Sequence, residues 1–312
     1  MKIGIDMMGG DFAPAEVLKG IHLYLSGHTI PATLVMIGDQ PSIEKLLPGN
    51  LIRADQVQLV HAPEVIGMHE HPSKAFREKK QSSISIGYQL LEKGEIDAFI
   101  SAGNTGAMLA GALFNIKPLE NLIRPAISSM IPKSDGTTGL LLDVGLNADC
   151  KPEQLDQFAI MGSVYAQLVL GIEDPSIGLI NVGEEEEKGN LLSKAAFSLL
   201  KKNKNIRFTG NIEGRDVLHN KADVMVCDGF TGNILLKMAE SLYTIARDKK
   251  LNSGFFERFN FEHYGGTPVL GIAKPVIIGH GISHGMAFMN MIHLAQVMVE
   301  KDVMNKMKER LK

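Results

Sequence analysis

Four glycine-rich turns in the sequence combine residue types that suit the binding of an anion. They are residues 6–11, 101–106, 181–190 and 228–233, and each follows a short apolar run and precedes a helical pattern. In open parallel sheets ligands bind outside the carboxyl ends of the strands, where glycine lets the backbone approach closely. The helix after each turn offers unpaired N–H groups and a positive dipole end. The set predicts a phosphate-type ligand, although any single glycine could serve only a tight turn or close packing.

The common phosphate-binding and hydrolytic motifs are absent. No Gly-x-x-x-x-Gly-Lys-Ser/Thr sequence occurs, which argues against a P-loop nucleotide hydrolase, and the Gly-x-Gly-x-x-Gly fingerprint for a dinucleotide is missing. Gly281-x-Ser283-x-Gly285 has the pattern of a hydrolase nucleophile turn. The chain order of that triad requires an Asp or Glu between the serine and the histidine, but none occurs between Ser283 and His293. We therefore expect Ser283 to cap the following helix.

Other reactive side chains have simpler interpretations. Cys227 ends an apolar run, which predicts a buried, unreactive thiol. His69, Glu70 and His71 lack distant partner ligands, so we expect an exposed loop and no metal site. A reaction whose nucleophile is the bound anion needs no nucleophile from the protein. For phosphate, which is ionised at neutral pH, the protein would hold it, desolvate it and stabilise an oxyanion on the second substrate.

The elements that position these turns alternate along the chain. We expect strands at residues 2–6, 33–38, 58–61, 98–101, 140–144, 177–182, 206–209 and 224–227. We expect helices at residues 15–25, 42–47, 84–93, 105–115, 152–169, 188–202, 232–247 and 283–310. This alternation predicts an α/β fold with a doubly wound, mostly parallel sheet. Residues 126–131 fit a strand or a helix.

The composition is that of a globular protein with no strong field. The chain has 312 residues, 32 Lys and Arg, 35 Asp and Glu, and a net charge of −3, which argues against nucleic-acid binding. Its 2 cysteines cannot form a disulfide framework. The first residues do not resemble a signal peptide, and no run approaches the ~20 apolar residues of a membrane span, so we expect a cytoplasmic protein.

No linker or low-complexity segment divides the chain, so we expect a single domain over residues 1–312. Residues 249–264, which contain several phenylalanines, are expected to form an excursion from the sheet. The acidic run of residues 184–187 predicts a solvated loop rather than a metal site.

The turns closely resemble the motifs of the PlsX family of bacterial phosphate acyltransferases, in order, over almost the whole chain. The matching segments are residues 8–14, 101–107, 124–126, 141–145, 161–163, 181–190, 228–233 and 264–266. The resemblance implies a three-layer α/β/α fold like that of the isocitrate and isopropylmalate dehydrogenases. It implies an enzyme that transfers a fatty acyl group from acyl carrier protein to inorganic phosphate, giving acyl phosphate for phospholipid synthesis.

The resemblance also implies partners and a location. We expect a homodimer without a nucleotide or metal cofactor, a link to glycerol-3-phosphate acyltransferase, and peripheral contact with the inner face of the membrane. The family usually carries a long amphipathic helical insertion where this chain has only residues 249–263, which puts the membrane-binding hairpin in doubt. The phenylalanines of residues 255–261 could bind lipid or an acyl chain, or could pack in a dimer interface.

Site residues follow from the turns and the resemblance together. The expected phosphate-binding residues are Gly9, Gly10, Gly103, Asn104, Thr105, Gly106 and Gly232. Lys188 and Asn233 are expected to stabilise the phosphate or the oxyanion. Lys188 could instead offset the acidic run, and both asparagines could be helix caps. His61 and His280 are candidate proton carriers, although either could be structural. Asp6, Asp11 and Asp228 are expected to orient the turns, because a carboxylate repels phosphate.

An acidic donor such as acyl carrier protein needs a basic surface on the enzyme. Lys74, Arg77, Lys79 and Lys80 form the densest candidate, which could also be a solvated face. Two other functions stay open at this stage. One is an NAD-dependent dehydrogenase of the isocitrate type, which would need a carboxylate cluster for a metal. The other is a non-catalytic scaffold that binds carrier protein, which would leave four anion-binding turns unused.

Overall fold

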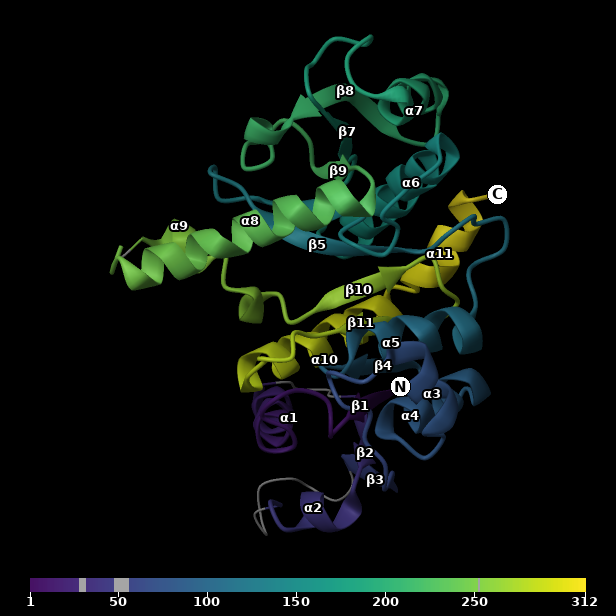
Figure 1. Cartoon of the computed structure of the whole chain (residues 1–312), viewed down its shortest axis with the longest axis vertical. Helices are drawn as coiled ribbons and strands as arrows, with labels where there is room; N and C mark the ends of the chain where they lie inside the picture. The colour runs from purple at the N-terminus through teal and green to yellow at the C-terminus, as the bar shows by residue number, and fades with distance from the viewer. Residues whose placement is uncertain (28–31, 48–55, 252) are drawn as a thin grey trace. The chain divides into compact units, whose positions relative to one another are not determined.

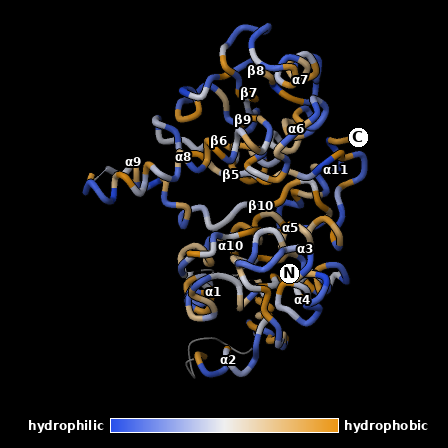
Figure 2. The backbone as a smooth tube through the Cα atoms, viewed as in Figure 1, coloured by the Kyte–Doolittle hydropathy of each residue, from blue (hydrophilic) through white to orange (hydrophobic). Residues whose placement is uncertain are grey.

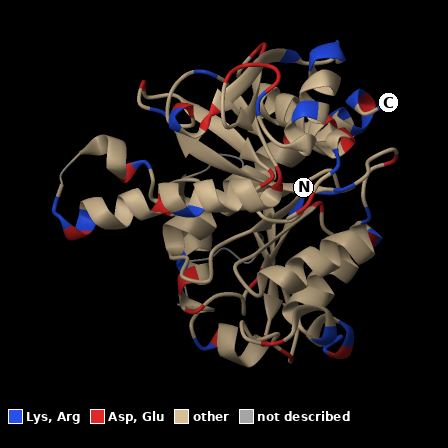
Figure 3. Cartoon of the chain, turned by 45° about the horizontal axis from the view of Figure 1, so that its top comes forward, with Lys and Arg blue, Asp and Glu red and all other residues tan. Residues whose placement is uncertain are grey.

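The computed structural model describes residues 1–27, 32–47, 56–251 and 253–312, which form two compact units (Figure 1). Unit 1 comprises Met1–Lys117 and Glu262–Glu300, and unit 2 comprises Pro118–Phe261 and Lys301–Lys312. Hydrophobic residues follow the strands of both units, while charged residues concentrate on loops and outer helix surfaces (Figures 2 and 3). Each unit therefore has an apolar sheet covered by amphipathic helices.

The sheet of unit 1 has the strand order β3-β2-β1-β4-β11-β10. Its strands are β1 (Lys2–Asp6), β2 (Thr33–Gly38), β3 (Val57–His61), β4 (Ala98–Ser101), β10 (Thr267–Leu270) and β11 (Val276–Ile278). The pairings within this set are parallel except that of β10 with β11. All residues of β4 are buried, as expected of a strand covered on both faces.

Helices cover both faces of this sheet. They are α1 (Ala15–Gly27), α2 (Gln40–Glu44), α3 (Pro72–Glu78), α4 (Ser83–Lys93), α5 (Thr105–Gly111), a π-helical turn η1 (Ala112–Ile116) and α10 (Gly285–Glu300). The Phe99 side chain of β4 lies under α4, where a Cβ at Gly87 would be 2.2 Å from the ring. Successive strand residues face opposite sides, so Ala98 and Ile100 face the side on which α10 contacts β4.

The sheet of unit 2 has the order β5-β6-β9-β7-β8. Its strands are β5 (Ala126–Pro132), β6 (Thr138–Leu142), β7 (Ser176–Asn181), β8 (Arg207–Glu213) and β9 (Val224–Val226). The pairing of β5 with β6 is antiparallel and the other pairings are parallel. Its helices are α6 (Pro152–Leu168), α7 (Leu191–Lys202), the 3-10 turn η2 (Gly214–Asp216), α8 (Gly229–Asp248), α9 (Gly254–Glu257) and α11 (Val303–Arg310). A further 3-10 turn, η3, spans Phe261–His263.

The predicted α/β architecture is confirmed as mostly parallel sheets with helices on both sides. Strands β1, β2 and β4 have the predicted bounds, and residues 126–131, which fitted either type, belong to β5. The antiparallel strand β10 and the short helix α3 were not predicted. Proline-containing and short apolar segments of this kind carry little periodicity.

The single helix predicted over residues 283–310 is wrong. Asp302 has a φ of 53°, a left-handed conformation that ends α10 and begins α11. The predicted cap at Ser283 is also wrong. The Ser283 Oγ is buried with no hydrogen-bond partner among the described residues. Instead, the Gly285 N–H at the start of α10 donates to Glu16 Oε2 over 2.7 Å, so a carboxylate from α1 caps the helix.

Within the predicted excursion of residues 249–264, the described residues 253–264 contain the short helix α9 and the 3-10 turn η3. Phe255 packs edge-on against Phe256 and Phe259, and Phe259 is buried. Arg258 donates to the carbonyl oxygens of Lys133 (3.0 Å) and Thr137 (2.6 Å) in the β5–β6 hairpin. Part of the phenylalanine cluster is thus used in packing within unit 2. Among the residues that the structure describes, no helix combines the length and apolar character needed to cross a bilayer.

The close contact between α1 and α10 gives a stability prediction. A Cβ at Gly20 of α1 would lie 2.4 Å from the Phe288 Cβ of α10, so Gly20→Ala should destabilise the protein by about 1–3 kcal/mol. Gly27, at the end of the same helix, has open space around it, so Gly27→Ala is the matched control and should be neutral or slightly stabilising. Urea unfolding of both variants measures the difference. Equal midpoints would show that the two helices are not packed this closely.

Candidate active site

A buried carboxylate joins the first two glycine turns, both in unit 1. Asp6, at the end of β1, is 1% exposed and accepts hydrogen bonds from the Met8 N–H (2.9 Å) and the Ser101 hydroxyl (2.6 Å). Ser101 Oγ in turn accepts from the Gly103 N–H over 2.9 Å. Burial raises the pKa of Asp6, and these hydrogen bonds oppose the shift. A Cβ at Gly9 would lie 2.5 Å from Asp6 Oδ2, so only glycine fits between the two turns.

A third loop, between β11 and α10, meets the first turn. Gly10 has a φ of +105°, which favours glycine, and a Cβ there would lie 3.1 Å from the Gly281 carbonyl oxygen. The Asp11 N–H donates to that same carbonyl over 2.7 Å. The loops after β1, β4 and β11 therefore converge at the carboxyl ends of parallel strands, where the sequence predicted a ligand site.

Asn104 is a helix cap in the structure. Its Oδ1 accepts from the Ala107 N–H at the start of α5 over 3.1 Å. Its Nδ2 lies within 3.0–3.3 Å of three carbonyl oxygens in residues 67–70, so its side-chain donor is already used. The N–H groups of Thr105 and Gly106 have no acceptor among the described residues. Any anion bound at this turn would therefore meet main-chain amides rather than the Asn104 side chain.

His61 lies at the end of β3, as predicted. Its Nδ1 accepts a hydrogen bond from the Gln40 N–H at the start of α2 over 3.1 Å. An Nδ1 that accepts leaves the proton of the neutral ring on Nε2. The exposed ring therefore has a structural bond on one nitrogen and one nitrogen open to exchange.

The predicted basic residues lie on and just after α3, next to the second glycine turn. A Cβ at Gly106 would be 2.4 Å from the Pro72 ring, so the first residue of α3 contacts the first turn of α5. Lys74, Arg77 and Lys80 are exposed. The basic surface therefore borders the glycine turn directly.

Lys79 differs from its basic neighbours because its charge is already paired. Its ammonium lies 2.6 Å from Glu70 Oε1 and donates to the Val65 carbonyl over 2.7 Å. The hydrogen bond that Lys79 donates to the Glu70 carboxylate is the main cause of the lowered pKa of Glu70. Lys79 holds the loop between β3 and α3, which leaves the exposed residues of α3 and Lys80 to face a partner.

The turn after β9 in unit 2 starts the long helix α8. Asp228 Oδ1 accepts from the Thr231 N–H over 2.8 Å and caps the helix, as an orienting role predicts. A Cβ at Gly232 would lie 1.9 Å from the Asp143 carbonyl oxygen, so glycine is required for the helix to approach that loop. Asn233 is exposed and lies beside Gly145. Its side chain is therefore accessible next to the start of the helix.

Asp143 is a positioning residue that sequence analysis did not identify. It is fully buried and accepts from the N–H groups of Ile127 (3.0 Å) and Asn147 (2.6 Å) and from Asn147 Nδ2 (3.0 Å). Burial raises its pKa, against these hydrogen bonds. The segment Asp143-Val144-Gly145 belonged to a matched motif, which was the only signal for it in the sequence.

Lys188 is exposed in the turn between β7 and α7. The acids of the neighbouring run pair with other lysines: Glu184 lies 2.8 Å from Lys221, and Glu186 lies 2.6 Å from Lys201. Within the described part of the chain, the Lys188 ammonium has no ion pair. Lys188 therefore forms no ion pair with the acidic run in the described structure, and its cation is accessible to a ligand.

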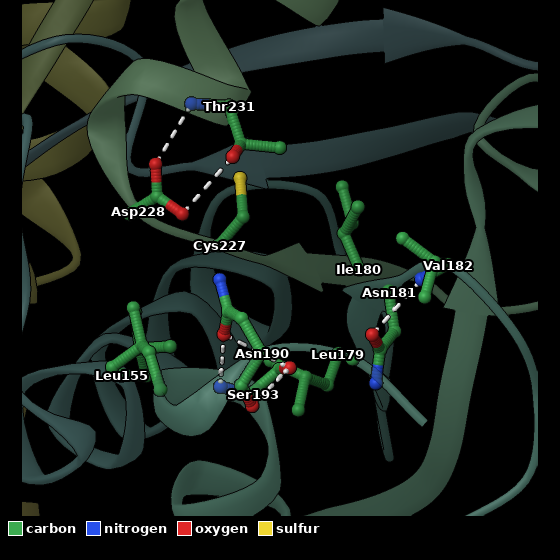
Figure 4. A pocket seen from close by; sticks show the side chains of 12 residues that line it. Leu155, Leu179, Ile180, Asn181, Val182, Asn190, Ser193, Cys227, Asp228 and Thr231 are labelled. Atoms are coloured by element: carbon green, nitrogen blue, oxygen red, sulfur yellow. Dashed lines mark hydrogen bonds between the residues drawn. The ribbon is translucent and has the colours of Figure 1, made fainter.

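A cavity of about 290 Å³ opens between these two turns of unit 2 (Figure 4). Its walls come from α6, the end of β7, the start of α7 and the turn from β9 to α8. Residues next to Lys188 (Gly189 and Asn190) and residues just before Gly232 (Asp228 and Thr231) therefore line the same cavity.

The remaining candidate nucleophiles are buried or half-buried thiols, and the described residues that could bind a metal are not grouped together. Cys227 is buried, as predicted, and burial raises the pKa of its thiol far above the ordinary value. Burial, with the nearby charge of Asp143, raises the pKa of Cys150 to about 12. Among the described residues, no three His, Cys, Asp or Glu side chains are grouped to hold a metal ion.

Comparison with known proteins identifies the family of this chain. The family model described as "Fatty acid synthesis protein" matches residues 1–306. The phosphate acyltransferase of Thermoanaerobacterium thermosaccharolyticum is 42% identical over 98% of this chain and 95% of its own length. That of Desulforamulus reducens is 41% identical over 100% of this chain and 97% of its own length.

Solved structures show the same fold at low identity. A phosphotransacetylase from Streptococcus pyogenes is 19% identical, with a TM-score of 0.65 over 96% of this chain and 94% of its own. EutD phosphotransacetylase from Staphylococcus aureus is 17% identical, with a TM-score of 0.64 over 95% and 94% of the two chains. The relatives and the matching family model confirm the predicted family: the chain belongs to the fatty acid synthesis protein family, whose members include the phosphate acyltransferases.

Proposed function

We propose that this protein transfers a fatty acyl group from acyl carrier protein to inorganic phosphate. A phosphate oxygen forms a bond to the thioester carbonyl carbon, the C–S bond breaks, and the carrier-protein thiolate leaves and takes up a proton. The observation that carries this proposal is the convergence of the glycine turns of unit 1, where the Thr105 and Gly106 amides have no acceptor among the described residues. The Ser101 hydroxyl between these turns already donates to Asp6. The names of the relatives at about 40% identity support it.

We assign phosphate binding to the main chain of the glycine turns. The residues proposed for it are Gly9, Gly10, Gly103, Thr105 and Gly106 in unit 1 and Gly232 in unit 2, with Asn104 acting through its cap of α5. Main-chain amides at a helix start can bind an anion. The nearby carboxylates of Asp6 and Asp228 already accept hydrogen bonds from protein donors. The tight approaches at Gly9 and Gly232 explain why side chains are absent there.

Lys188 and Asn233 are the proposed catalytic side chains of unit 2. The unpaired Lys188 cation would neutralise charge on the phosphate or on the oxyanion that forms at the thioester carbon. The exposed Asn233 amide would donate a hydrogen bond to the same developing charge. His61, with Nε2 open to exchange, is proposed to return a proton to the leaving thiolate.

The proposal extends to partners and place of action. The exposed residues Lys74, Arg77 and Lys80 would receive the acidic carrier protein, with Lys79 holding the loop beneath. A homodimer, delivery of the acyl phosphate to a glycerol-3-phosphate acyltransferase, and a cytoplasmic location with peripheral contact to the membrane also belong to the proposal. The fatty acid synthesis description of the family supports this setting.

The finer fold type and the competing functions follow from the same comparisons. The phosphotransacetylase neighbours support our proposal of an isocitrate dehydrogenase-like, three-layer fold. The alternative of an NAD-dependent dehydrogenase lacks support, because the described residues hold no carboxylate cluster for its metal. A scaffold role is not favoured, because full-length relatives are named as acyltransferases.

The decisive experiment measures release of free carrier-protein thiol from an acyl carrier protein donor, with and without phosphate. We expect release only with phosphate, and an acyl product that reacts with hydroxylamine as acyl phosphates do. Release that is independent of phosphate would indicate a thioesterase and would contradict the proposal.

Lys188→Ala should lower kcat by about 100-fold or more, the cost of losing one oxyanion-stabilising group. Asn233→Ala should act in the same direction. Lys201→Ala, which removes a cation already paired with Glu186, is the control and should retain near-normal activity. Initial rates of thiol release at saturating phosphate measure the effect. Near-normal rates for Lys188→Ala would remove this assignment.

Reversing the exposed charges of α3 should weaken the encounter with the carrier protein. The double variant Arg77→Glu, Lys80→Glu is expected to raise KM for the acylated carrier protein with little change in kcat, and to reduce the salt dependence of kcat/KM. Lys93→Glu is the control. Lys93 ends α4 just before β4 begins, so it lies near the amino end of that strand, whereas the glycine turn follows its carboxyl end. If both variants have the same KM, α3 does not receive the donor.

A further inference from the structure

The cavity of unit 2 has a wall that none of the roles above uses. Leu155 of α6 (2% exposed) and Leu179 of β7 (1% exposed) line it together with Ile180 and Leu192. Cys227, whose thiol is neutral, also lines it. Figure 4 shows Leu155, Leu179, Ile180 and Cys227 around the space, with Leu155 and Ile180 on different sides. The lining is therefore largely apolar below the rim.

The charges around the cavity argue against an anionic occupant. Among the described residues that line it, none is Lys, Arg or His. Asp228 is the charged one, and its oxygens are bonded to the Thr231 N–H (2.8 Å) and hydroxyl (3.0 Å). A phosphate inside would meet this carboxylate without a compensating cation. An uncharged group suits the cavity better.

The rim provides a place for one polar group. Asn190 Oδ1 accepts from the Ser193 N–H over 2.8 Å, while its Nδ2 has no acceptor among the described residues. Figure 4 shows that amide nitrogen pointing into the cavity. Val182, 78% exposed, extends the apolar lining to the surface. An occupant with one carbonyl and an alkyl chain would match both parts.

The size of the space sets the length of that chain. An apolar cavity of about 150 Å³ can hold a benzene molecule, with its six carbons. By the same scale, a cavity of about 290 Å³ holds about twelve carbon atoms. The cavity is open to solvent on one side, so a longer chain would continue past Val182.

We propose that this cavity binds the alkyl chain of the acyl donor, with the thioester carbonyl at the Asn190 amide, and that Leu192 limits the chain length accepted. The proposal rests on the proposed acyltransferase function for its substrate. It adds a binding subsite and specificity-determining residues. The bound chain would lie against Leu155 and Leu179, between the turns that hold Lys188 and Gly232.

Leu192→Trp tests the subsite because it fills part of the cavity from the first turn of α7. It displaces about two methylene groups, each worth about fourfold, so kcat/KM for a dodecanoyl donor should fall about fifteenfold. For a butanoyl donor, which is too short to reach the filled part, kcat/KM should stay within about twofold. The matched control is Leu191→Trp, the preceding residue, which is 89% exposed and does not line the cavity.

Calorimetric titration with dodecanol, an uncharged alkyl probe, tests the cavity without relying on activity. The wild type and Leu191→Trp should bind one equivalent, and Leu192→Trp should bind much more weakly. If no donor reacts with phosphate, the proposed function fails and this titration alone decides: selective loss in Leu192→Trp supports the subsite, and absence of binding to the wild type overturns it.

When the donors do react, the ratio of kcat/KM values decides. A selective loss for the dodecanoyl donor in Leu192→Trp supports the proposal. Equal losses for both donors, no loss, or the same change in Leu191→Trp overturns it. Circular dichroism checks folding, and Leu192→Phe replaces the tryptophan variant under the same criteria if that variant does not fold.

Discussion

The hydrogen bonds of one buried carboxylate organise the proposed phosphate site of unit 1. Asp6 accepts from Met8 in its own turn and from Ser101 in the next, and Ser101 passes the connection to Gly103. A buried acid is costly unless its oxygens are bonded, so these contacts and the shape of the turns depend on each other. The Asp6 carboxylate is buried, and its oxygens accept hydrogen bonds from protein donors. The Thr105 and Gly106 amides at the start of α5 have no acceptor in the part of the chain that the structure describes.

In unit 2, Asp143 and Asp228 likewise accept hydrogen bonds from the turns, and Lys188 lies exposed in the turn between β7 and α7. Asp143 binds main-chain amides under the start of α8, and Asp228 caps that helix. Glu184 and Glu186 of the acidic run near Lys188 are paired with other lysines. Carboxylates in both units thus accept hydrogen bonds from the turns and hold their shape. This division of labour fits a reaction in which phosphate itself supplies the nucleophile.

The sequence predicted the strands and turns well because their signals are local. Apolar runs that end in glycine, such as the segment around Asp6, identify strand ends directly. It failed where distant contacts decide. The Asn104 side chain donates to carbonyl oxygens in residues 67–70, and Glu16 of α1 caps α10. Neither contact follows from a local sequence pattern. The fully buried Lys133, which donates to the Ala222 carbonyl, likewise has no sequence signal.

The central claim is that bound phosphate attacks the thioester directly, with no acyl group passing through the protein. Intact-protein mass spectrometry tests it most directly, after rapid mixing with the acylated carrier protein in the absence of phosphate. The account predicts an unmodified mass, since burial raises the thiol pKa of Cys227 and Cys150 and the Ser101 hydroxyl beside the glycine turns already donates to Asp6. A stoichiometric acyl adduct that disappears when phosphate is added would contradict it.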